Sequence, residues 1–383
     1  MNKKLIAVAL AALPVAAMAD VTIYGTLKGG LEHDSITNQA SQNKVQDDTS
    51  IIGFKGTEDL GNGLKTIWQV ENRLHVDGGT TSDTFASRQT FVGLDGGNLG
   101  TLRLGRLNNT LNDFYSVDQW QYASTVGSSG NGHTSGVNGL GIFTNSGDRV
   151  KNAIRYDSAT FFGLSATAMY GFGENATNTA HADGTTGASN IWGVALNYTY
   201  GPVAAHYAYN KETNPNQPDL TTTNTLGANS NKAASKQLLE VDFNQDAWFV
   251  GAAYQWSTGY DWADDFAGDA GSTYTIHGTT YNPVSAQLKA RQAALSVGYT
   301  IGAFTPKFTY AKGWDMKQGD TTLNNTGYSQ YILGVDYALS KRTTAGVSFG
   351  RLSMDKNTAT AQYETAGQDM KANTFAVNFA HNF

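Results

Sequence analysis

The last eleven residues, "NTFAVNFAHNF" (373–383), decide the fold class. Side chains alternate between the two faces of a strand, so Phe375, Val377, Phe379 and Phe383 share one face. Alanine and asparagine occupy the other face, at positions 376, 378, 380 and 382. An aromatic face on a terminal strand would fray in water, which indicates that this face is built to meet lipid or a partner subunit.

The same alternation recurs upstream. In "WFVGAAYQW" (248–256), Trp248, Val250, Ala252, Tyr254 and Trp256 fall on one face. The two tryptophans would lie roughly 20 Å apart along a membrane normal, close to the spacing of two aromatic girdles. "NIWGVALNYTYG" (190–201) repeats the scheme. One such strand would be typical of a soluble sandwich edge, whereas its recurrence along the chain favours a transmembrane β-barrel.

Alternating segments recur sixteen times. An even number places the two termini side by side, so the last strand can pair with the first and close the sheet. Short turns alternate with long polar loops, as expected of the two sides of an outer membrane. We therefore predict an all-β, 16-stranded antiparallel transmembrane β-barrel with strands at 21–33, 48–58, 62–76, 83–95, 99–107, 149–158, 161–173, 189–200, 202–212, 235–244, 247–258, 286–301, 303–314, 327–339, 342–354 and 371–383.

The first residues have the layout of a secretory signal peptide. Two lysines precede an apolar run from Leu5 to Val15, and small residues stand at Ala17 and Ala19. This run is too short to span a bilayer as a helix. We predict a signal peptide at 1–19, export through the general secretory route, and a single barrel domain at 20–383.

Composition excludes several classes of function. The chain has no cysteine, which excludes disulfides and thiol chemistry, and its formal charge of −6 argues against nucleic acid as a partner. The histidines lack ligand spacing, so the sequence predicts no transition-metal site and no cofactor. "GVSFG" (346–350) matches a nucleophile elbow but lies inside an alternating strand, so we predict no enzyme activity. The acidic loop 261–269 is either a divalent-cation bridge to lipopolysaccharide or a solvated loop.

Several longer motifs carry a family resemblance. "DVTIYGTLKGGLE" (20–32), "IGFKGTEDLGNGLKTIWQVE" (52–71), "SRQTFVGLDGGNLGTLRLGRLNN" (87–109) and "YSQYILGVDYALSKRT" (328–343) are examples. From Asp20 to Phe383 the chain resembles the general diffusion porins of Gram-negative outer membranes, most closely the neisserial and β-proteobacterial branch. The resemblance implies a homotrimer in the outer membrane whose water-filled channels are narrowed by an inward-folded third loop. It also implies that Phe383 is read by the β-barrel assembly machinery, with membrane lipid and lipopolysaccharide as further partners.

Charged side chains on the inward phase of the strands are candidates for the channel wall, because a wet lumen removes the desolvation cost that lipid would impose. Some of them would merely solvate that wall. The resemblance implies that Arg73, Arg88, Arg149 and Arg155 form a cluster facing the third loop. The predicted basic wall residues are Lys28, Lys55, Arg73, Arg88, Arg103, Arg149, Lys151, Arg155 and Lys307.

The third loop corresponds to the stretch between Asn108 and Asp148. Its carboxylates opposite the arginines would set a transverse field, and we expect passive diffusion of ions and small hydrophilic solutes with a mild anion preference. The alternative is a substrate-specific channel, for instance for sugars, in which the loop aromatics form a stacking track. The predicted loop residues are Asp113, Tyr115, Asp118, Trp120 and Tyr122.

Trimer contacts are expected on the outward phase of the early strands. Arg106 would be costly against lipid, so we predict that it forms an intersubunit ion pair. We assign Leu27, Gly29, Leu31 and Gly93 to the same outward surface because small and apolar side chains suit close subunit packing.

Overall fold

In the computed structural model, the terminal stretch forms strand β21 (Met370–Asn382), and its two faces differ as the alternation predicts. Ala372, Ala376 and Ala380 are buried, whereas Phe375 and Phe379 are about half exposed on the opposite face. The apolar face of this strand is therefore the outer surface, and the small residues face the interior of the sheet.

The structure describes residues 20–38, 40–78, 84–114, 117, 120, 149–173, 190–213, 233–260, 274–276, 279–281, 287–356 and 368–383. The predicted signal peptide at 1–19 lies outside these residues. No helix among them is long and apolar enough to cross a membrane.

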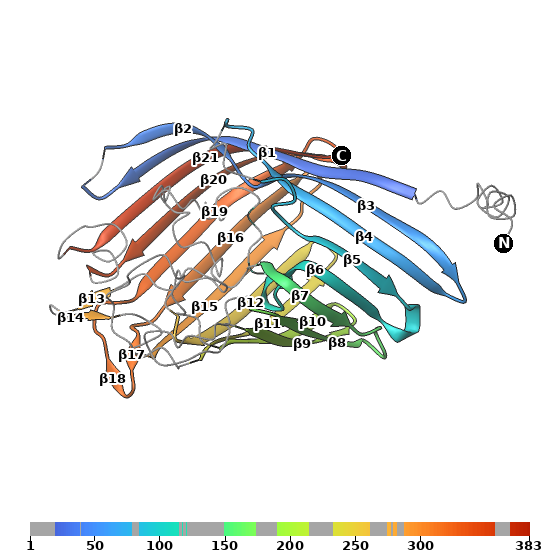
Figure 1. Ribbon diagram of the computed structural model, residues 1–383. Helices are drawn as coiled ribbons and strands as arrows, with labels where there is room; N and C mark the ends of the chain where they lie inside the picture. Colours follow the sequence, from blue (N-terminus) through green and yellow to red (C-terminus); the bar gives the residue numbers. More distant parts are fainter. Residues whose placement is uncertain are drawn as a thin grey trace, which may run out of the picture.

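Within the described part of the chain, sixteen antiparallel strands form one closed sheet (Figure 1). β2 (Gln42–Asp47) continues the second of them, β3, beyond a break at 48–49. The sixteen are β1 (Asp20–Ile36), β3 (Ser50–Gly61), β4 (Leu64–Leu74), β5 (Thr90–Asp95), β6 (Thr101–Asn108), β7 (Arg149–Asp157), β8 (Leu164–Gly171), β9 (Ile191–Tyr200), β10 (Val203–Glu212), β11 (Ala234–Gln245), β12 (Trp248–Thr258), β15 (Leu288–Tyr299), β16 (Phe304–Gly313), β19 (Tyr328–Ala338), β20 (Thr343–Met354) and β21.

The first and last strands close the barrel. β1 pairs with β3 and β2 along one edge and with β21 along the other. The backbone of Gly25 exchanges two hydrogen bonds with that of Phe383, at N···O distances of 3.1 and 3.0 Å. In Figure 1 the two strands lie side by side, and the β3–β4 and β5–β6 turns lie at the same end of the barrel. The sixteen-stranded sheet is thus closed on itself, as a membrane barrel requires.

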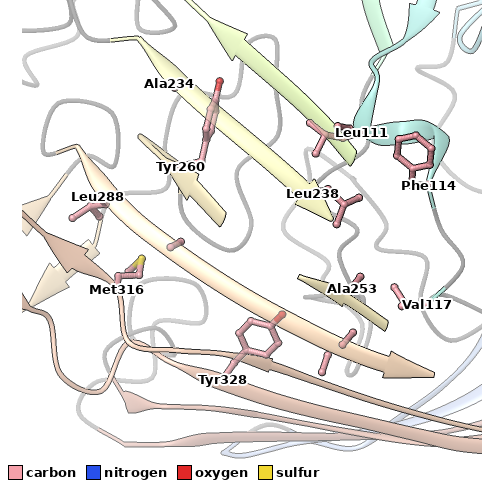
Figure 2. Close-up of a cluster of buried hydrophobic side chains, with 14 of the residues drawn as sticks. Leu111, Phe114, Val117, Ala234, Leu238, Ala253, Tyr260, Leu288, Met316 and Tyr328 are labelled. Atoms are coloured by element: carbon pink, nitrogen blue, oxygen red, sulfur yellow. The ribbon is translucent and has the colours of Figure 1, made fainter. Parts of the chain in front are cut away.

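Buried apolar side chains lie inside the barrel rather than between two sheets. Figure 2 shows them converging from several strands and from the short 3-10 helix η2 (Leu111–Asp113). Leu111 in η2 and Leu107 in the preceding strand β6 are fully buried. The interior near η2 is therefore packed, which holds this segment against the wall.

The predicted strands agree with the structure in number and, to within a few residues, in most of their ends. The main shift is at 83–95, where regular pairing starts only at Thr90. The sequence did not predict β2, the β13–β14 hairpin (Tyr274–Ile276 and Thr279–Tyr281) or the β17–β18 hairpin (Lys317–Gln318 and Thr321–Thr322). The outward assignment of Gly93 was wrong: it pairs with Arg103 on the inward phase, while Val92 and Leu94 are exposed outside.

Candidate functional site

The inward phase of the strands carries most of the predicted basic residues. On β1, Lys28 shares its face with the buried Glu32, whereas Leu27 and Leu31 are exposed outside. The strand register places Lys55, Arg73, Arg103, Arg155 and Lys307 on the same inward phase, and Arg88 contacts it through Glu71. Seven of the nine predicted wall bases lie on this phase or contact it: Lys28, Lys55, Arg73, Arg88, Arg103, Arg155 and Lys307.

The inward assignment of Arg149 and Lys151 was wrong. β6 and β7 slip in register where Asn152 adopts a positive φ of 51°, which adds one residue to β7. A one-residue slip moves all preceding side chains to the other face. Val150, opposite the buried Leu107, therefore takes the inward position, and Arg149 and Lys151 fall on the outward phase.

Carboxylates pair with most of these bases. Arg88 Nε lies 2.5 Å from Glu71 Oε1, and Arg73 Nη2 lies 3.3 Å from Asp47 Oδ2. Lys307 Nζ lies 2.7 Å from Asp336 Oδ2. The wall is thus a set of ion pairs rather than a purely basic surface.

Sequence reasoning missed several of these acids. Asp157 follows Arg155 by two residues and Asp336 lies on the inward phase of β19, so the alternation could have identified both. Asp47 is the last residue of β2, next to the break at 48–49, where the alternation of inward and outward side chains is interrupted. Lys44, which lies 2.7 Å from Asp34, was missed for the same reason, since β2 was not predicted.

Lys55 has a different environment. Its ammonium lies 5.1 Å from the centroid of the Tyr24 ring, and the Tyr24 hydroxyl donates to Glu71 at 3.3 Å. Lys55 itself is exposed on the inward side. It therefore presents a positive charge to solvent inside the barrel.

Arg155 holds the beginning of the third loop. Its Nη2 lies 2.5 Å from Asp113 Oδ2 and 2.7 Å from Asp157 Oδ1. Arg103 binds the other oxygen of Asp157. Asp113 lies in η2, outside the spanning strands. Burial raises the pKa of its carboxyl, and the positive charge of Arg155 offsets this rise only in part. Two arginines and two carboxylates thus form a four-membered charged cluster.

Other contacts of the loop reach more distant strands. The Thr110 hydroxyl donates to Asn210 Oδ1 at 2.8 Å, and the Phe114 ring stacks on His206 with a centroid distance of 4.8 Å. Trp120 Nε1 donates to Thr309 Oγ1 at 2.9 Å. The described loop residues therefore contact inward side chains of β7, β10 and β16.

Several predicted residues have no structural test. Tyr115, Asp118, Tyr122 and the acidic loop 261–269 lie outside the described residues. Arg106 lies on the outward phase of β6, opposite Thr90, with Leu102 and Leu104 exposed on the same face. Its placement agrees with the sequence, and its role as a trimer contact stays a prediction.

Comparison with known proteins gives the family. A family model described as "Gram-negative porin" matches residues 7–360. The major outer membrane protein P.IB of Neisseria sicca is 34% identical over 381 residues, covering 96% of this chain and 98% of the relative. P.IB of Neisseria meningitidis (strain H44/76) is 33% identical over 366 residues, covering 93% and 95%.

A solved structure supports the fold. The chain is similar to an anion-selective porin from Comamonas acidovorans with a TM-score of 0.67 and 21% identity, covering 95% of this chain and 100% of that one. At this identity the likeness concerns architecture alone. Together with the closed barrel and its charged interior, the sequence matches lead to one conclusion. The chain belongs to the Gram-negative porin family and forms a channel in the outer membrane.

Proposed function

We propose that the channel is a general diffusion pore for ions and small hydrophilic solutes with a mild preference for anions. The observation that carries this proposal is the exposure of the ion pairs along β2 and β4. The side chain of Arg73 is 22% exposed against 1% for Asp47, and that of Lys44 is 24% exposed against 0% for Glu32. The bases of this wall thus face water, while their carboxylates lie beneath them.

The opposite arrangement occurs near the third loop. Asp113 and Asp157 are each more exposed than Arg155, and Asp336 is more exposed than Lys307. A basic wall facing an acidic one sets a field across the lumen, which orients dipolar solutes and weights ion selectivity. Because nearly every base has a carboxylate close by, the net selectivity should be weak. The Comamonas relative, described as anion-selective, is in line with this direction.

The alternative of a sugar-specific channel receives less support. Trp120, the one described member of its proposed aromatic track, is 4% exposed and donates its indole N–H to Thr309. The Lys307 ammonium lies 4.7 Å from the centroid of its ring. A ring buried in this way cannot stack on a sugar in the channel. The track would therefore have to be formed by Tyr115 and Tyr122 alone.

The reversal potential of the purified protein in a planar bilayer under a salt gradient tests the proposal. We expect a small displacement toward the anion side, and Lys55→Met should reduce it because this exposed base faces the lumen. A reversal potential on the cation side would contradict the anion preference. Saturable block of the conductance by an oligosaccharide would support the substrate-specific channel instead.

We propose further that the protein is a homotrimer, inserted by the β-barrel assembly machinery and surrounded by lipid and lipopolysaccharide. Replacing Arg106 by leucine should leave the conductance of a single barrel intact and lower the melting temperature of the trimer, because an ion pair between subunits is lost. Gel mobility of unheated and heated samples measures this melting. Arg291→Leu provides a control, since Arg291 is exposed on the outward phase of β15, and β16, β19, β20 and β21 lie between this strand and β1. An unchanged melting temperature in Arg106→Leu would count against the assignment.

A further inference from the structure

We propose that His206, Glu240 and Asp242 bind a divalent transition-metal ion, such as Zn²⁺, on the inward wall of the barrel. His206 lies on β10 directly opposite Glu240 on β11, and Asp242 follows Glu240 by two residues on the same face. One ligand atom of each residue lies within 4.8 Å of the others. His206 Nε2 is 3.4 Å from Asp242 Oδ2. This matches the ligand-to-ligand separation of about 3.4 Å that bonds of about 2.1 Å give in a tetrahedral site.

Asn197 on the neighbouring strand β9 favours the tautomer of His206 that can bind a metal through Nε2. Asn197 Oδ1 lies 3.0 Å from His206 Nδ1, and Asn197 Nδ2 donates to Ser165 Oγ at 3.4 Å. Because the Nδ2 group of Asn197 donates to Ser165, its Oδ1 is the atom that faces His206 and accepts a hydrogen bond from the Nδ1–H group. The lone pair of Nε2 is then directed toward the two carboxylates. A histidine ligand whose second nitrogen donates to a fixed acceptor is the usual arrangement in protein metal sites.

The third loop completes the support for this ring. Phe114, which Figure 2 shows beside the loop residue Leu111, stacks on His206 with an interplanar angle of 26°. The imidazole is thus held on one face by an aromatic ring and at one edge by an amide. A ligand fixed before binding loses less side-chain entropy when the ion arrives.

The three groups line a cavity of about 470 Å³, together with Asp113, Arg155 and Asn197. This volume leaves room for water molecules or a small anion to complete the coordination. Three protein ligands and an open position describe an exchangeable site rather than a closed structural one. One imidazole with two carboxylates suits Zn²⁺ and similar ions better than Ca²⁺ or Mg²⁺, which prefer oxygen alone.

The spacing of the ligands explains why the sequence predicted no such site. His206 and Glu240 are separated by 34 positions and meet only because β10 and β11 pair in this register. Neither residue belongs to a local metal-binding pattern. A bound ion would add two positive charges to the cavity that also holds Asp113 and Arg155. The bound ion should therefore increase the preference of the channel for anions. This effect on selectivity rests on the proposed diffusion pore, whereas the binding of the ion does not.

Isothermal titration of the detergent-solubilised protein, without a histidine tag, with Zn²⁺ tests the site. We expect saturable binding of one ion per chain that weakens at least 100-fold in His206→Gln. Asn197→Ala, which removes only the positioning group, should weaken it about 10- to 100-fold. His33→Gln is the matched control, because His33 is exposed on the outward phase of β1. Titration of wild type with Co²⁺ should give visible absorption bands that are lost in His206→Gln.

Two results would overturn the proposal: no saturable Zn²⁺ binding by the wild type, or equal binding by wild type and His206→Gln. Heat-dependent gel mobility confirms that each variant is folded. The reversal potential measured with and without Zn²⁺ then separates this inference from the pore itself. If Zn²⁺ binds but the reversal potential does not change, the metal site stands and only its effect on selectivity is refuted.

Discussion

Replacing Arg155 by methionine should destabilise the barrel and shift its reversal potential toward cations. Arg155 is bound to Asp113 and Asp157, and its loss leaves one of these carboxylates, Asp113, without its cationic partner. Removing one member of a buried pair costs about 3–5 kcal/mol. Because the two carboxylate side chains are 27% and 24% exposed, we expect the low end, roughly 3 kcal/mol. Urea unfolding in lipid vesicles measures this loss.

The double variant Arg155→Met with Asp113→Asn is the decisive control. It removes both partners, so no uncompensated charge remains at the loop, and Asp157 keeps its contact with Arg103. We expect it to recover most of the stability and to return the reversal potential toward the wild-type value. If the double variant is as unstable as the single one, then Arg155 acts by packing rather than by holding Asp113.

An arginine in place of Leu196 should have a comparable effect on stability for a different reason. Leu196 lies in the middle of β9, 52% exposed on the outward phase, opposite Tyr207 and Ala166. A lipid-facing arginine near the bilayer midplane costs about 2–4 kcal/mol. The folding equilibrium constant should fall about 30- to 1,000-fold, measured by urea titration of the vesicle-inserted protein.

Ser165→Arg is the matched control for Leu196→Arg. Ser165 lies on β8 next to Ala166, at a similar depth, but on the inward phase and at the edge of the polar cavity. An arginine there meets water and carboxylates, so stability should change by less than about 1 kcal/mol. Equal losses in both variants would contradict the assignment of the two faces.

Sequence reasoning predicted the barrel well because lipid on one side and water on the other impose a period of two on every spanning strand. The alternation in β21, for example, reappears as buried alanines and exposed phenylalanines. The prediction failed where the period is broken. The extra residue at Asn152 reversed the face of Arg149 and Lys151, and a one-residue slip leaves no trace in composition.

The candidate site was less predictable. Phase alone could place Lys28, Lys55 and Lys307 on the inward wall. It could not show which carboxylate meets which base, since Arg73 and Asp47 are brought together by the break after β2 rather than by a shared strand. The meeting of His206 with Glu240 depends on the register of the two antiparallel strands β10 and β11. Pairings of this kind arise from three-dimensional register, which a single sequence does not display.

The two hydrogen bonds between Gly25 and Phe383 also limit the order in which the barrel can form. These residues are 358 positions apart (383 minus 25), so the seam that they form cannot exist until both β1 and β21 have been synthesised. Every earlier intermediate carries β1 with one unsatisfied edge, which is an open template for aggregation. Strand pairings of such sequence separation also form slowly. The barrel therefore closes only when β21 reaches β1, whatever the order in which the strands between them pair.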